Sequence, residues 1–184
     1  MTLIGDLRLE MGIDILTDLT VHPDQRVRRA LIRSLAMIGG KKSVAPLLTL
    51  TQDQATALRR PAVKALGATN SLDAVRPLLK IAQSFDPFGR QAEIRSDAVS
   101  ALGSLGKKEA YFPLLALAKR PNLLRLKRLE ELRAEIILAL GKLGETNLDI
   151  ALTQWRKSPH GIVRRAAEQS QATLMKKHDN LTTN

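Results

Sequence analysis

The stretch "IRSDAVSALGSLGKKEAYFPLLALA" (94–118) decides the fold, because the chain repeats it. Three near-copies and one shorter copy align with it: "VRRALIRSLAMIGGKKSVAPLLTLT" (27–51), "LRRPAVKALGATNSLDAVRPLLKIA" (58–82), "LRAEIILALGKLGETNLDIALTQWR" (132–156) and "VRRAAEQSQATL" (163–174). Self-similarity at a period of roughly 20–50 residues is the signature of a repeat architecture, in which each unit buries its apolar face against its neighbours.

Each copy opens with an amphipathic helix that carries one arginine in a fixed register. Apolar residues stand one position before this arginine and, in most copies, three, seven and ten positions after it, which places them on one face of an α-helix. A small residue always follows at the sixth position and lets a neighbouring helix approach closely. Glycines at the eighth or eleventh position are expected to cap the helix end. We call the five registered residues the ladder arginines: Arg28, Arg59, Arg95, Arg133 and Arg164.

A second, shorter helix follows the first in four copies, beginning near "VAPLL", "AVRPLL", "AYFPLL" and "LDIAL". Pro46, Pro77 and Pro113 fit the first turn of such a helix, where the missing N–H costs little. Two helices per unit at a fixed period predict an all-α fold, a right-handed α-solenoid of about five two-helix repeats. We expect one repeat domain over 1–176 and a polar C-terminal tail over 177–184, with units at about 1–40, 41–70, 71–106, 107–144 and 145–176.

The two ends of the array differ. "LIGDLR" (3–8) reads as the end of a first helix, so the chain begins in the middle of a unit. This end either docks on another chain, continues a longer protein, or is a short degenerate cap. The last unit is polar and has Gln171 in place of a core leucine, as expected of a terminal cap.

The motif "VR..A..ALG.LG" followed by "PLL.L" resembles the HEAT-repeat superfamily, and is most similar to the short HEAT-like repeats named after phycobilisome lyases. The resemblance covers roughly residues 12–175. It implies a solenoid whose first helices line the concave surface. Such repeats serve as scaffolds, adaptors, chromophore lyase subunits and parts of some DNA-repair enzymes, so the resemblance leaves the function open.

The amino-acid composition limits the classes of partner and cofactor that the protein can be expected to bind. Lys and Arg number 29 against 18 Asp and Glu, a net charge of +11 that is spread along the chain and favours an acidic partner, either protein or nucleic acid. There is no cysteine, and the three histidines lack metal-ligand spacing, so we expect no metal or cofactor. No signal peptide or apolar run of about 18 residues occurs, which favours a soluble cytoplasmic protein.

The turns before the third and fourth ladder arginines are enlarged, because successive ladder arginines are 31, 36, 38 and 31 residues apart. The extra residues lie in "SFDPFGRQAE" (84–93) and "KRPNLLRLKRLEEL" (119–132), which should project from the same edge of the solenoid. Either these turns bind a partner or the second is a helix extension with a charged face. The candidate contacts are Phe88, Arg90, Arg120, Arg125, Lys127 and Arg128.

The ladder arginines are expected to be structural, paired with Asp24, Asp53 and Asp86 in the first three units. No aspartate occupies the equivalent turn for Arg133 or Arg164, so these two are predicted to lack that partner. Further basic residues one and five positions after the ladder arginine form a basic stripe. The predicted binding groove therefore contains Arg29, Arg33, Arg60, Lys64, Arg133, Arg164 and Arg165.

No catalytic constellation is found. Glu130, Glu131 and Glu135 are interpreted as a salt-bridged surface, and Phe112 and Trp155 as core residues. We predict a non-catalytic scaffold or adaptor that binds an acidic protein partner through the basic groove and the enlarged turns. The alternative is a protein that binds RNA or DNA through the backbone, although stacking aromatics are few. A subunit of a bilin-lyase-like complex follows from the resemblance alone.

Overall fold

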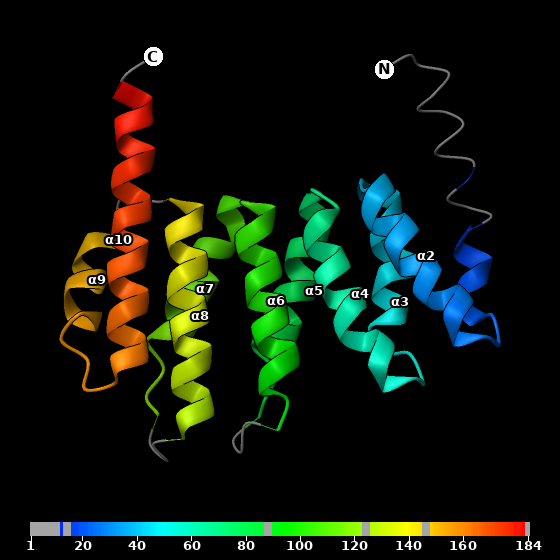
Figure 1. Cartoon of the computed structure of the whole chain (residues 1–184), viewed down its shortest axis with the longest axis horizontal. Helices are drawn as coiled ribbons and strands as arrows, with labels where there is room; N and C mark the ends of the chain where they lie inside the picture. The colour runs from blue at the N-terminus through cyan, green and yellow to red at the C-terminus, as the bar shows by residue number, and fades with distance from the viewer. Residues whose placement is uncertain (1–11, 13–15, 87–89, 123–125, 145–147, 183–184) are drawn as a thin grey trace.

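The computed structural model describes residues 12, 16–86, 90–122, 126–144 and 148–182, and every regular element in these ranges is helical. This confirms the all-α prediction. Five long helices lie side by side in one layer, and four short helices form a second layer behind them (Figure 1). The long helices are α2 (Gln25–Ile38), α4 (Thr56–Ala68), α6 (Ala92–Leu105), α8 (Lys127–Leu143) and α10 (Gly161–Thr182). The short ones are α3 (Val44–Leu50), α5 (Val75–Ala82), α7 (Tyr111–Ala118) and α9 (Asp149–Trp155).

The two layers bury a continuous aliphatic core. Each short helix packs chiefly against the long helix that follows it, and each long helix packs against the next long one. Leu35, Leu66, Leu102 and Leu140, all seven positions after a ladder arginine, are completely buried. Stacking of equivalent faces is how repeats that cannot bury their apolar side alone become stable.

Short 3₁₀ helices join the long helices to the short ones on one edge: η2 (Lys41–Ser43), η3 (Leu72–Ala74) and η4 (Lys108–Ala110), while η1 (Leu19–Val21) precedes α2. Pro46, Pro77 and Pro113 are each the third residue of their short helix, as predicted. The opposite edge carries the turns that lead into the long helices, at the bottom of Figure 1. We call it the turn edge.

The glycines have two roles, and one differs from the prediction. Gly39, Gly106 and Gly144 end long helices with positive φ angles, as expected of caps. Gly67, at the eighth position, instead lies inside α4, where an added Cβ would come within 2.8 Å of the Cα of Ala101. Its equivalents Gly103 and Gly141 face Ala139 and Ser170 in the same way, so glycine meets the predicted small residue where long helices approach.

The ends of the array match the expectations only in part. α10 continues to Thr182, so most of the expected tail 177–184 is helical. The interpretation of residues 3–8 as the end of a helix lies outside the described residues. Among the helices that the structure describes, none is both long and apolar enough to cross a membrane.

Candidate binding surfaces

All five ladder arginines donate hydrogen bonds to backbone carbonyl oxygens just before their own helix, either in the turn or at the last residue of the preceding short helix. Arg28 bonds His22 and Pro23, Arg59 bonds Asp53, Arg95 bonds Ala82, Arg133 bonds Ala118 and Arg120, and Arg164 bonds Ser158 and Pro159. Each arginine thus fixes the turn to the first turns of its long helix. This confirms the structural role predicted for the ladder position.

The carboxylate partner of the first ladder arginine is not the predicted one. Asp24 caps α2 by accepting a hydrogen bond from the N–H of Arg26 at 2.7 Å. Arg28 instead binds Asp53 of the next turn, with Nε–Oδ2 2.6 Å and Nη2–Oδ1 2.9 Å. Both side chains are nearly buried, and the hydrogen bonds from Arg28 hold the pKa of Asp53 below its usual range. The sequence predicted a partner for Arg28 in its own unit, but the observed pair with Asp53 links two successive units.

Arg95 pairs with Asp86 as predicted, but at a longer distance than Arg28 and Asp53. Its Nη1 lies 3.9 Å from Oδ2 of Asp86, and both side chains are buried. Burial lowers the pKa of Arg95. Asp86 also accepts hydrogen bonds from the N–H groups of Arg90 and Gln91, each at 2.8 Å, and so organises the first enlarged turn.

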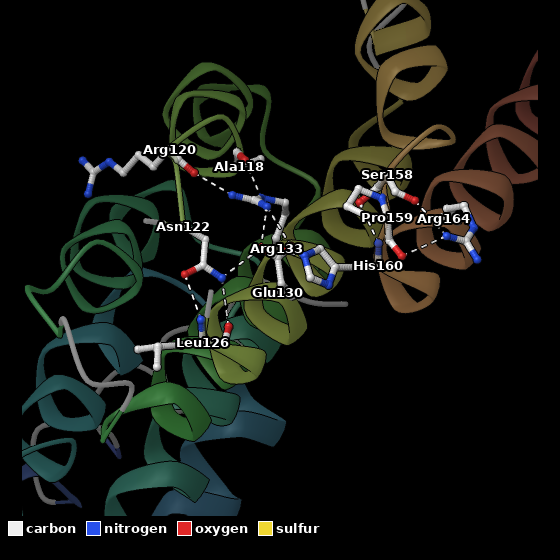
Figure 2. A network of polar contacts seen from close by, with 10 residues as sticks. All are labelled: Ala118, Arg120, Asn122, Leu126, Glu130, Arg133, Ser158, Pro159, His160 and Arg164. Atoms are coloured by element: carbon white, nitrogen blue, oxygen red, sulfur yellow. Dashed lines mark hydrogen bonds and ion pairs between the residues drawn. The ribbon is translucent and has the colours of Figure 1, made fainter. Parts of the chain in front are cut away.

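Arg133 has a carboxylate partner that was not predicted. Its Nη1 donates to both oxygens of Glu130, at 2.8 and 2.7 Å, and Figure 2 shows it between Glu130 and the carbonyls of the preceding turn. Glu130 was predicted on a salt-bridged surface; the salt bridge is confirmed, but the side chain is only 3% exposed, so its place on the surface was wrong. Asn122 donates to Glu130 and exchanges two hydrogen bonds with the backbone of Leu126. The network ties the second enlarged turn to α8.

The basic stripe is interrupted at α4. Nε of Arg60 lies 2.5 Å from Oδ2 of Asp97, and its Nη1 contacts Glu93. Lys64 lies 3.4 Å from the other oxygen of Asp97. The exposed cations at this place are therefore neutralised by α6. Outside α4, three further members of the stripe are exposed and form no ion pair or hydrogen bond through their side chains with other described residues: Arg29, Arg33 and Arg165.

The enlarged turns are partly described. Phe88 and Arg125 lie outside the described residues, while Arg90, Arg120, Lys127 and Arg128 are exposed. α8 begins at Lys127, so the second stretch is a helix extension from this residue onward. Lys127 lies 3.7 Å from Glu131, as the predicted spacing indicates.

Several exposed residues were missed or misplaced by the sequence analysis. Phe112 is 70% exposed rather than in the core, and Phe85 is 91% exposed. Arg76 and Lys80 on α5 lie with Arg59 around a depression of about 830 Å³. In "RPLLK" (76–80), Arg76 and Lys80 are four residues apart, and this spacing could have suggested two cations on one face of α5. Within the described ranges, no three His, Cys, Asp or Glu side chains form a group able to hold a metal ion.

The geometry defines a two-layer helical repeat protein, and comparison with known proteins agrees. Residues 13–96 match the sequence model of HEAT repeats, which confirms the resemblance to the HEAT-repeat superfamily. No curated protein matches the chain.

Solved structures that share the fold include the following two. One is the complex of CpcE and CpcF of phycocyanin lyase from Nostoc sp. PCC7120, with 21% identity, a TM-score of 0.66 and 89% of this chain covered. This chain spans 65% of the length of that chain. The other is human deoxyhypusine hydroxylase, with 14% identity, a TM-score of 0.54, and coverage of 94% of this chain and 99% of that one. The chain therefore has a HEAT-like helical solenoid fold.

Proposed function

We propose that the protein is a non-catalytic scaffold or adaptor that binds an acidic protein partner. The proposal rests on which of the cations one and five positions after the ladder arginines form ion pairs within the protein. Arg60 and Lys64 are neutralised by α6, whereas Arg29 and Arg33 on α2 and Arg165 on α10 have no partner among the described residues. Exposed cations without a carboxylate attract and orient an anionic partner.

A structural use of the buried carboxylates supports the non-catalytic part of the proposal. Asp53, Asp86, Asp97 and Glu130 each bind an arginine, and Asp53 and Asp86 also accept backbone N–H groups. Carboxylates whose oxygens are already occupied by such structural contacts are not free to act on a substrate. The similar phycocyanin lyase structure is a complex of two proteins, which supports a protein as partner.

The test is capture from a nuclease-treated lysate of the source organism on the immobilised protein. We expect proteins that wild type retains to be lost with R29A/R33A/R165A. The matched control K42A/K157A/K176A removes the same charge from three exposed lysines outside the stripe and the enlarged turns, and it should retain these proteins. Identical retention by all three forms would overturn the role of this face.

Nucleic-acid binding is the second candidate, and the exposed rings of Phe85 and Phe112 favour it, because exposed aromatics stack on bases. Labelled RNA and DNA should then bind at micromolar or tighter concentration at about 150 mM salt, above the usual non-specific level. Binding that disappears by this salt concentration would exclude this candidate. A role as a subunit of a bilin-lyase-like complex ranks third, since only the fold supports it.

A further inference from the structure

Three depressions adjoin one another along the turn edge. The first, of about 320 Å³, includes Val21 and Gln52 in its lining. The central one, of about 830 Å³, shares Gln52 with the first and Ser84 with the third. The third, of about 260 Å³, includes Ser84 and Phe85. Shared lining residues make the row continuous, and we call it the turn-edge groove.

The central depression combines an apolar floor with cations. Leu48 of α3, Pro77 and Ile81 of α5 and Ile94 of α6 contribute the apolar part. Arg59, Arg76 and Lys80 also line it, and none of the described residues that line it is acidic. An apolar surface with a few convergent charged groups is the usual composition of a binding site.

The hydrogen bonds of Arg59 differ from those of Arg28, which occupies the same place in the preceding unit. Arg28 uses Nε and both η nitrogens on Asp53, His22 and Pro23. Arg59 uses only Nε, on the carbonyl of Asp53 at 2.7 Å, because the carboxylate of Asp53 is taken by Arg28. Its η nitrogens have no acceptor among the described residues.

The other two cations of the central depression are also available. The side chains of Arg76 and Lys80 are exposed and form no ion pair or hydrogen bond with other described residues. Three cations with unused donors therefore surround one apolar floor. The η nitrogens of arginine and the ammonium group of lysine donate hydrogen bonds and do not accept them, so they require an acceptor from a ligand.

We infer that the turn-edge groove binds an extended acidic segment of a partner protein, with an apolar side chain on the floor of the central depression and carboxylates on Arg59, Arg76 and Lys80. The inference rests on the proposed function and adds a second contact for the acidic partner, separate from Arg29, Arg33 and Arg165 on the long helices. A row of three adjoining depressions can hold an extended segment of a partner's polypeptide chain. A nucleic acid would stack on aromatic rings, whereas the floor consists of Leu48, Pro77, Ile81 and Ile94.

The experiment uses two fluorescein-labelled peptides of equal length and charge, with fluorescence anisotropy as the readout. One is glutamate-rich with interspersed leucines, and the other has serine in place of each leucine. We expect the leucine peptide to bind about tenfold more tightly, because only it fills the apolar floor. R76A/K80A should weaken its binding by about tenfold or more. L48S should weaken only the leucine peptide.

The matched control is K157A/K176A, which removes two exposed lysines that lie outside the lining of the three depressions. This variant should bind the leucine peptide as wild type does. Circular dichroism should show unchanged helicity for every variant, since each changed side chain is exposed.

Equal affinity for the two peptides, or unchanged affinity in R76A/K80A, would overturn the inference. Tighter binding of a labelled oligouridine RNA that R76A/K80A abolishes would also overturn it, in favour of nucleic acid. If both peptides fail while lysate capture still depends on Arg29, Arg33 and Arg165, the groove is wrong and the proposed function stands. If the leucine peptide binds while lysate capture is the same in all forms, the groove stands and the long-helix face is wrong.

Discussion

Arg28 binds the carboxylate of Asp53 through two hydrogen bonds across the boundary between two repeats. The carboxylate also accepts the N–H of Ala55 at 2.8 Å, so one side chain holds both the preceding helix and its own turn. The pair fixes the distance between the turns that precede α2 and α4. It therefore acts as a clamp between units as well as a local contact.

Removing this clamp should destabilise the protein. D53N leaves Arg28 without its carboxylate in a nearly buried place, and we expect a loss of about 2 kcal/mol, the scale of hydrogen bonds to charged groups. Urea unfolding followed by circular dichroism measures the change. D73N is the control, because the pair of Asp73 with Lys41 is exposed and should matter little. Equal midpoints for D53N and D73N would contradict the clamp.

The same pair should make stability depend on pH. Arg28 lowers the pKa of Asp53 in the folded state, so its stabilisation is complete above the unfolded pKa and is lost as the pH falls through the folded pKa. The difference in unfolding free energy between wild type and D53N should therefore shrink below about pH 4. Urea titrations between pH 7 and pH 3 test this, and a constant difference would refute it.

Gly67 should not tolerate alanine, although alanine favours helices. An added Cβ would lie 2.8 Å from the Cα of Ala101, a backbone atom that cannot move aside alone. We expect G67A to cost about 1–3 kcal/mol from overpacking. S104A, at an exposed position of α6, is the control. A stabilised G67A would show that the long helices separate easily.

Glu130 should be more important for stability than its neighbour Glu131. E130Q weakens the bonds to Arg133 in a buried site, with an expected loss of about 2 kcal/mol. The same change should loosen the turn before α8, which limited proteolysis would detect as faster cleavage near residue 122. E131Q affects only the exposed pair with Lys127 and should cleave as wild type does.

Arg60 and Lys64 should behave differently from the other cations of the stripe. R60A/K64A leaves the buried carboxylate of Asp97 without partners, so we expect lower thermal stability. Partner capture at a temperature where the variant is folded should equal that of wild type, because these cations are already neutralised. Loss of capture comparable to that of R29A/R33A/R165A would place α4 in the binding surface.

The fold could be predicted because its cause is local and repeated. The apolar positions around each ladder arginine and the prolines of the short helices specify two helices per unit, and they lie where the pattern placed them. The choice of partner for Arg28 could not be predicted, because Asp24 and Asp53 are equally plausible in sequence and only stacking brings Asp53 closer. The turn-edge groove was missed for the same reason, since four helices contribute to the lining of its central depression alone.

A second cause explains the side chains whose burial or partner was predicted wrongly. Tyr111 and Phe112 are adjacent, and the pattern does not specify which ring faces the core; Tyr111 is buried and Phe112 is exposed. Glu130 precedes its ladder arginine by three positions, one helical turn, so the spacing could have suggested the pair with Arg133.

The contact between α2 and α4 is weaker than the contacts between the later long helices. Glycine meets a small residue at the junctions α4–α6, α6–α8 and α8–α10, but at α2–α4 the equivalent position holds Ala36, and these two helices share less contact. In a one-dimensional array, the weakest nearest-neighbour interface opens first. Among the described long helices, hydrogen exchange should therefore be fastest in α2, whereas the four helices joined by glycine contacts, α4, α6, α8 and α10, should open cooperatively.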